Sequence, residues 1–144
     1  DRIDETVQRI RSVHEERFHY LRNYTEGPTF ASLNRYKEKC FLIQALMRDW
    51  QAAGRLTGPA FALMERRGPG EELYDTAADP HEIRNLVDSE DPQHREALAR
   101  LRAALDTWIT DTGDRGAVPE PTEVVAPFAQ EMHDWFGTPA WARK

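Results

Sequence analysis

The sixteen residues EELYDTAADPHEIRNL, 71–86, constrain the fold of this chain more than any other stretch, because they hold strand, turn and helix-start signals together. The segment ELYD suits a half-buried strand, with Leu73 and Tyr74 on opposite faces. Small residues follow it, as a turn requires. We therefore expect a short strand that leads directly into a helix.

The expected helix start has a suitable residue at each of its first positions. Asp79 can accept hydrogen bonds from the first-turn N–H groups, and Pro80 occupies the first helical position, where no N–H is missed. Glu82 lies where a capping box places its carboxylate. The apolar stripe of this helix would be formed by Ile83, Leu86 and Val87.

A second helix start, Asp91-Pro92, repeats the combination of cap and proline and opens a long helix that ends at Gly113. Most charged residues of this helix fall on one side. The other side is apolar at helical spacing, and we expect it to be buried. It consists of Leu98, Leu101, Leu105, Trp108 and Ile109.

The pattern over residues 7–24 predicts two strands joined by a polar loop at 14–17. In the second strand, Phe18, Tyr20 and Tyr24 alternate onto one face. Such an aromatic stripe with a period of two is more often core than a platform for a ligand. We interpret it as the core face of a β-hairpin.

The middle of the chain is expected to be helical after a loop at 25–33, which the pair Gly27-Pro28 indicates. Asn34 can cap this helix, and Gly54 would end it as a C′ residue. Its apolar residues recur at spacings of three and four, which predicts a buried face. That face carries Tyr36, Cys40, Ile43, Leu46, Met47 and Trp50.

The glycines and prolines after this helix leave room for only one short helix, near 61–66. The last segment, 122–144, is rich in proline and aromatic residues. It is too aromatic for a solvated linker, so we expect it to lie along a surface.

The composition describes a folded protein without a nucleic-acid or membrane partner. Hydrophobic residues make up 40% and charged residues 31% of the 144 residues. The net charge of −6 argues against nucleic acid or an anionic membrane, which need clustered Lys and Arg. No apolar run reaches the roughly 20 residues of a membrane span. The chain begins without Met or a signal peptide, and we expect it to be an internal piece of a longer protein.

Residue chemistry alone does not predict an active site. The five histidines and the single cysteine lack the short spacing of zinc ligands; they are His14, His19, His81, His94, His133 and Cys40. Since Cys40 lies on the expected buried face, a core thiol is favoured over a nucleophile. Asp75 and Asp79 could pair for acid–base work or bind calcium, but Asp79 is already explained as a helix cap, and Asp75 as a turn residue at the end of a strand.

The stretch 71–86 resembles the E-L-Y-D-L…D-P-x-E-x-x-N-L signature in the C-terminal region of sulfatase-family hydrolases. The matching residues are Glu72, Leu73, Tyr74, Asp75, Asp79, Pro80, Glu82, Asn85 and Leu86, with Thr76 where Leu is commoner. Residues 11–24 are similar to the strand pair that precedes this signature, and residues 97–116 to the family's closing helix. DRIDET, residues 1–6, resembles a D-R-M-D-E segment of bacterial members related to heparan N-sulfatase.

The resemblance implies an α+β fold, in which a small antiparallel sheet packs against a long C-terminal helix, with additional helices. This domain would span 1–121, followed by a Pro/aromatic-rich tail at 122–144. Its partner would be the sulfatase catalytic domain of the same polypeptide. The face that docks there would be exposed in the isolated chain and could cause self-association. A periplasmic or extracellular location is favoured over the cytoplasm.

The family's nucleophile is a formylglycine made from the Cys or Ser of a C/S-x-P-x-R motif, and its metal is calcium. This chain has no such motif, since Cys40 is followed by FLIQ. The family's metal-binding motifs are missing too. We therefore expect a non-catalytic C-terminal domain of a sulfatase-like hydrolase, whose full-length enzyme cleaves a sulfate ester or sulfamate. We expect no catalytic residue, no metal ligand and no cofactor within this chain.

The resemblance leaves two residues as candidates for substrate binding, Arg2 and Asp4, at the rim of the full enzyme's pocket. Arg can bind a sulfate or a sugar carboxylate with two parallel hydrogen bonds. Equally, Arg2 could only brace the junction between domains. An alternative function for the whole chain is a stand-alone interaction module, which keeps this fold and binds a partner through its Trp-rich tail.

Overall fold

The computed structural model describes residues 2–3, 5–28, 30–65 and 67–143. The chain divides into two compact units, each with its own hydrophobic core. Unit 1 comprises residues 1–8, 26–67 and 119–144, and unit 2 comprises 9–25 and 68–118. The fold is α+β, as predicted, with the sheet and the long helix in unit 2.

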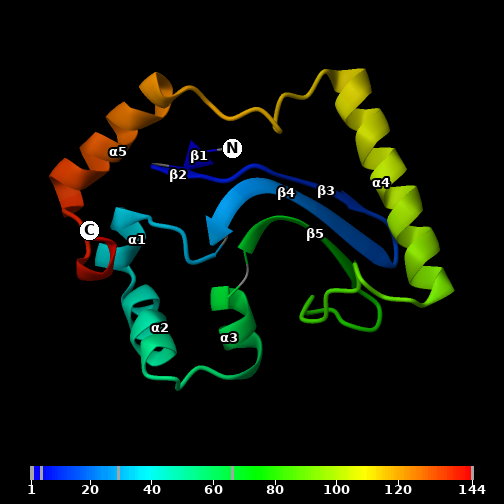
Figure 1. Ribbon diagram of the computed structural model, residues 1–144, viewed down its shortest axis with the longest axis horizontal. Helices are drawn as coiled ribbons and strands as arrows, with labels where there is room; N and C mark the ends of the chain where they lie inside the picture. The colour runs from blue at the N-terminus through cyan, green and yellow to red at the C-terminus, as the bar shows by residue number, and fades with distance from the viewer. Residues whose placement is uncertain (1, 4, 29, 66, 144) are drawn as a thin grey trace. The chain divides into compact units, whose positions relative to one another are not determined.

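Three strands form the sheet of unit 2 in the order β3-β4-β5 (Figure 1). Their bounds are Ile10–His14, Phe18–Pro28 and Arg67–Asp75. The hairpin of β3 and β4 is confirmed, with Ile10 opposite Asn23 and His14 opposite His19. Beyond the end of β5, the N–H of Thr76 donates to the carbonyl of Arg17, just before β4, at 2.8 Å. Strand β5 is therefore antiparallel to β4.

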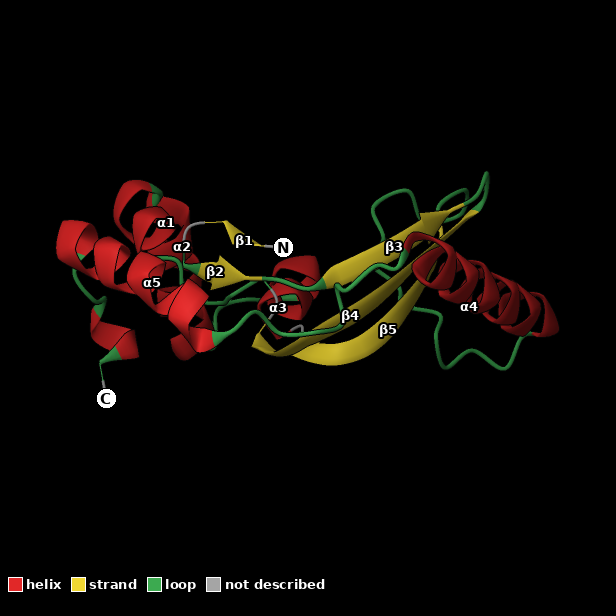
Figure 2. Ribbon diagram, turned by 90° about the horizontal axis from the view of Figure 1, so that it is seen from above, coloured by secondary structure: helices red, strands yellow, loops and turns green. Residues whose placement is uncertain are grey.

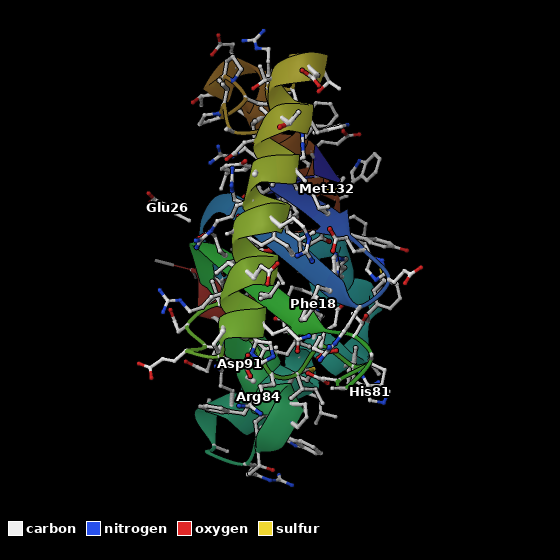
Figure 3. All side chains as sticks on the ribbon, turned by 90° about the vertical axis from the view of Figure 1, so that its right-hand side faces the viewer. Phe18, Glu26, His81, Arg84, Asp91 and Met132 are labelled. Atoms are coloured by element: carbon white, nitrogen blue, oxygen red, sulfur yellow. The ribbon has the colours of Figure 1, made fainter. Side chains whose placement is uncertain are left out.

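Helix α4, Pro92–Thr112, begins and ends as the sequence predicts. The Asp91 carboxylate accepts from the N–H of Gln93 at 2.8 Å, and Gly113 adopts the left-handed conformation with φ 61°. Figure 3 shows α4 lying over the strands, with Phe18 and Asp91 toward the same end of the helix. The rings of His94 and Phe18 make a T-shaped contact there, with 6.1 Å between their centroids.

The core of unit 2 lies between the sheet and α4. It is formed by Phe18, Tyr20, Leu73, Leu86, Ala97, Leu98, Leu101 and Leu105, all buried. The core interpretation of Phe18 and Tyr20 is confirmed. The prediction that Trp108 is buried is wrong. This residue is 47% exposed, and the smaller Ile109 packs against the core instead.

The alternation of β4 changes near its middle, which the aromatic stripe did not predict. Tyr24 is only half-buried, and Asn23 is buried in its place. The Asn23 carboxamide oxygen accepts from the N–H of Thr25 at 2.8 Å, so the buried side chain has a backbone partner within its own strand. The predicted loop at 25–33 is wrong in its first part, since β4 continues to Pro28.

The predicted helix after Asp79 is absent, and its residues form turns against the edge of the sheet. The Asp79 carboxylate accepts from the N–H groups of Ile83 and Arg84, both at 2.7 Å. Glu82 takes a left-handed conformation, φ 52°, which no helix allows. Asp79 therefore accepts from backbone N–H groups as predicted, but these groups belong to a turn instead of a helix.

Asn85 and Leu86 explain why a turn forms where a helix was expected. The Asn85 carboxamide oxygen accepts from the N–H of Leu73 at 3.0 Å, and its amide donates to the carbonyl of Glu71 at 3.2 Å. The N–H of Leu86 donates to the carbonyl of Leu73 at 2.7 Å. This segment therefore satisfies the backbone of β5, a strand at the edge of its sheet.

Unit 1 is mainly helical, with two short strands (Figures 1 and 2). Its elements are β1 (Arg2–Ile3), β2 (Thr6–Val7), α1 (Arg35–Cys40), α2 (Leu42–Ala52), α3 (Gly58–Glu65), α5 (Thr122–Phe136) and η1 (Ala140–Ala142). Its small core joins Ala31, Leu56 and Met64. None of the helices in the described part of the chain is long and apolar enough to cross a membrane.

The single helix expected after Asn34 is two helices, because Phe41 between them has an extended backbone. The cap is confirmed, since the Asn34 carboxamide oxygen accepts from the N–H of Lys37 at 2.9 Å. Gly54 ends α2 with φ 65°, also as predicted. The tail forms α5, which packs on α1 and holds Pro127 inside the helix.

Candidate functional site

A network of charged side chains joins β4, β5 and α4 in unit 2. Glu71 accepts from both Arg102, with Nε at 2.9 Å, and the hydroxyl of Tyr20. Arg22 donates to the Tyr20 hydroxyl at 3.0 Å and to Asp106 at 2.6 Å. The hydrogen bonds from Arg102 hold the pKa of Glu71 below its usual value. Each of these groups has a partner, so the network is suited to stabilising the fold.

The carboxylate of Asp75 is likewise fully engaged. It accepts from Arg17, with Nη2 at 2.6 Å, and from the N–H groups of Ala77 and Ala78, both at 3.2 Å. These bonds, chiefly the one from Arg17, lower the pKa of Asp75. The turn interpretation is confirmed. Among the described residues, no group of three His, Cys, Asp or Glu side chains could hold a metal ion.

His14 and His19 meet across the hairpin, with their rings edge-on at 5.3 Å between centroids. Nδ1 of His19 contacts Oε1 of Glu82 at 2.7 Å. Glu82 is the residue with the left-handed backbone, and this contact links its turn to the hairpin. Among the described residues, the pair has no third ligand with which to hold a metal ion.

Cys40 is exposed, so its interpretation as a core thiol is wrong. The reason lies in the face on which it was placed. Met47 of that face packs against the core of unit 1, but the other large apolar residues of α1 and α2 on or beside it are 37–82% exposed: Tyr36, Ile43, Leu46 and Trp50, together with Phe41 and Leu42. We call these six residues the apolar face.

Helix α2 leaves most of its large apolar residues exposed and buries a polar residue. Leu42 is 82% and Ile43 56% exposed, whereas the polar Gln44 is buried. Amphipathic helices normally bury their apolar stripe. The sequence correctly predicted one apolar stripe, but the protein leaves most of it uncovered.

Unit 1 also contains a shallow pocket of about 130 Å³ between β2 and the segment 30–37. Its lining residues are Thr6, Gln8, Phe30, Ser32, Asn34 and Lys37. The hydroxyl of Thr6 donates to the carbonyl of Leu33 at 3.1 Å and accepts from the amide of Asn34 at 2.9 Å. The amide of Gln8 donates to the Ser32 hydroxyl at 3.2 Å. Side-chain bonds therefore tie the two walls together.

Two acidic residues near this pocket in the sequence, Glu5 and Glu38, are paired with arginines. Glu5 is paired with Arg35, and its side chain is 3% exposed. Glu38 is paired with Arg48 at 2.7 Å and is 7% exposed. Arg48 also lies over the ring of Trp141, at 3.7 Å from its centroid, and so anchors η1. Sequence reasoning missed the pocket, because its residues carry no motif beyond the cap at Asn34.

The two predicted substrate-binding residues lie beside this region in the chain. Arg2 belongs to β1 and stands opposite Val7 of β2 in the ladder, next to Thr6. Asp4 lies outside the described residues. The assignment of Arg2 and Asp4 to substrate binding stays a prediction.

Two curated proteins resemble this chain. A ulvan-active sulfatase of Formosa agariphila is 35% identical over 120 residues, which are 83% of this chain and 20% of that protein. A Delta 4,5-hexuronate-2-O-sulfatase of Bacteroides thetaiotaomicron is 49% identical over 47 residues, which are 33% of this chain and 9% of that protein. No protein-family profile matches the chain.

The chain is therefore related to the sulfatases, and it spans about a fifth of the length of the longer-matching relative. Since 120 residues make up 20% of that sulfatase, its length is about 600 residues. Most of such a protein has no counterpart in these 144 residues.

Proposed function

We propose that this chain is the non-catalytic C-terminal part of a sulfatase-like hydrolase, whose full-length enzyme cleaves a sulfate ester or sulfamate. One observation supports the proposal most directly: the sequence match covers most of this chain but only a fifth of the length of the sulfatase. The chain also lacks any C/S-x-P-x-R motif from which a formylglycine could be made. The catalytic chemistry would then belong to the remainder of the polypeptide.

The residues present do not fit the cofactors that such an enzyme would need. Cys40 lies at the end of α1 and is followed by Phe41 and Leu42, without the required Pro and Arg. The described residues also offer no cluster of carboxylates and histidines for calcium. We therefore assign no catalytic step to this chain.

The apolar face of α1 and α2 supports a role in domain assembly. Large exposed apolar patches are uncommon on monomeric proteins and mark interaction surfaces. Here the exposed residues include Leu42 and Ile43, on a helix that buries the polar Gln44. The partner that fits best is the catalytic part of the same hydrolase, because that part is the bulk of the relative missing from this chain. Without it, the face would favour self-association.

The intact mass of the native protein and its reading frame test this proposal. A hydrolase of about 600 residues, with a C/S-x-P-x-R motif upstream of Asp1, is the expected result. A native protein of 16.6 kDa would instead favour the stand-alone interaction module. The two outcomes are exclusive, so one measurement separates the two functions.

A further inference from the structure

Four aromatic rings on unit 1 form a surface that fits a second copy of this chain. We infer that two copies pair through this surface in a closed dimer with twofold symmetry. The rings belong to Phe41, Tyr36, Phe136 and Trp135, and we call them the ring row. Such a dimer is a property of the 144-residue chain itself and goes beyond the proposed function. In a longer polypeptide, the catalytic part would compete with the second copy for Tyr36 and Phe41, which also belong to the apolar face.

The ring row is continuous, because each ring makes a T-shaped contact with the next. The centroid of the Tyr36 ring lies 5.7 Å from that of Phe41 and 5.6 Å from that of Phe136. The rings of Phe136 and Trp135 are 6.2 Å apart. Helices α1 and α5 pack on each other within unit 1 (Figure 2). The four rings therefore form one surface that extends the apolar face onto α5.

This surface is large beside the hydrophobic core of unit 1. The buried cluster of that unit joins Ala31, Leu56 and Met64. By contrast, Leu42 is 82% and Trp135 67% exposed. Contiguous exposed apolar side chains mark interaction surfaces, and aromatic residues are enriched in protein interfaces. Unit 1 therefore has the composition of a body that completes its apolar packing against a partner.

The charges beside the ring row make it complementary to itself. The exposed charged residues of α1 are Lys37 and Lys39. Helix α5 contains no lysine or arginine, and it carries the exposed Glu131 and Asp134 within four residues of Trp135. The surface therefore has a basic side on α1 and an acidic side on α5. A twofold axis between the two sides brings the basic side of each copy onto the acidic side of the other, so both contacts are attractive.

Analytical ultracentrifugation of the 144-residue chain measures this dimer, with a reducing agent present so that the exposed Cys40 forms no disulfide. As the concentration rises, the parent should reach twice its mass of 16.6 kDa and form nothing larger. Trp135→Ser should weaken the dimer about tenfold or more, since an aromatic anchor is lost. The matched variant Trp108→Ser, at a residue 47% exposed on α4, should associate as the parent does.

Charge reversal tests the twofold symmetry. One double variant combines Lys37→Glu with Lys39→Glu, and the other combines Glu131→Lys with Asp134→Lys. Each alone should dimerise about tenfold more weakly than the parent, because both contacts between its copies become repulsive. An equimolar mixture of the two should dimerise about as tightly as the parent, since each side then meets the opposite charge.

Two control variants make the same changes of net charge at exposed positions of unit 2. They are Arg84→Glu with Arg95→Glu, and Asp88→Lys with Asp111→Lys. Both should associate as the parent does, and thermal unfolding checks that every variant is folded.

A parent that stays monomeric, or whose mass keeps growing beyond the dimer, would overturn the inference. So would a mixture of the two charge-reversed variants that associates no more tightly than either variant alone. None of these readouts depends on turnover or on native mass, so the dimer and the proposed function can fail separately.

Discussion

Asn85 shows how one side chain of the 71–86 stretch holds the segment after Asp79, for which the sequence predicted a helix and not a turn. Its side chain bonds the backbone on both sides of β5 residue Glu72, through Leu73 and Glu71, and also accepts from the N–H of Val87. Asn85→Ala should lower the free energy of unfolding by about 2–3 kcal/mol, because the N–H of the buried Leu73 loses its partner. Urea unfolding measures this. The exposed neighbour Asp88→Ala should change it by less than about 0.5 kcal/mol.

The network around Glu71 gives the protein a pH dependence at both ends of the scale. The pKa of Glu71 is lowered by Arg102, so its stabilisation is complete above the usual value of 4.5 and is lost as pH falls below it. Burial and the bond to Glu71 raise the pKa of Tyr20 from 10.0 to about 12, so its stabilisation is lost as pH rises from 10 toward 12.

Urea unfolding between pH 3 and 7 and between pH 9 and 12 should therefore show stability falling at both extremes. Glu71→Gln should flatten the acidic limb, and Tyr20→Phe the alkaline limb. An acidic limb that is equally steep in Glu71→Gln and in the parent would show that Glu71 does not contribute to it.

At the level of elements, two large apolar residues of α4, Leu101 and Trp108, differ in how much they contribute to stability. Leu101 is fully buried against the sheet, whereas Trp108 is 47% exposed. Leu101→Ala should cost about 2–5 kcal/mol of unfolding free energy. Trp108→Ala should cost about 2–3 kcal/mol at most, less than the roughly 3–5 kcal/mol of a fully buried Trp, since about half of its surface stays in water. Acrylamide should quench the fluorescence of Trp108 in the folded protein, measured as the difference between the parent and a Trp108→Phe variant.

The elements with local signals were predictable from the sequence. The β3–β4 hairpin, the caps at Asn34 and Asp91, and the helix ends at Gly54 and Gly113 all depend on residues close in the chain. The turn after Asp79 was not predictable, because its cap residues suit a turn as well as a helix. The hydrogen bonds between Asn85 and β5 favour the turn over the helix.

The pocket and the apolar face could not be predicted for a related reason. The pocket joins β2 to a loop 24 to 28 residues away through contacts without a motif. The stripe on α1 and α2 was visible in the sequence, but periodicity does not say whether a partner or the chain's own core covers a face. Helix α5 was missed because Pro127 and the other prolines indicate a break.

For the whole molecule, the apolar face predicts self-association of the isolated chain. Leu42 is 82% exposed, so Leu42→Glu should leave the fold intact and shift sedimentation toward the monomer. Gln93→Glu at the start of α4 adds the same charge on an exposed polar position and should leave association unchanged. A parent chain that stays monomeric at high concentration would remove this assembly role from the apolar face.

The central claim is that this chain is a part of a sulfatase-like hydrolase and carries none of its catalytic chemistry. The most direct test is turnover of a chromogenic aryl sulfate by the purified chain, with and without calcium, beside its Cys40→Ala variant. The account predicts no turnover by either protein under either condition. Sulfate release by the parent that disappears in Cys40→Ala would contradict it, because the exposed Cys40 would then be a nucleophile.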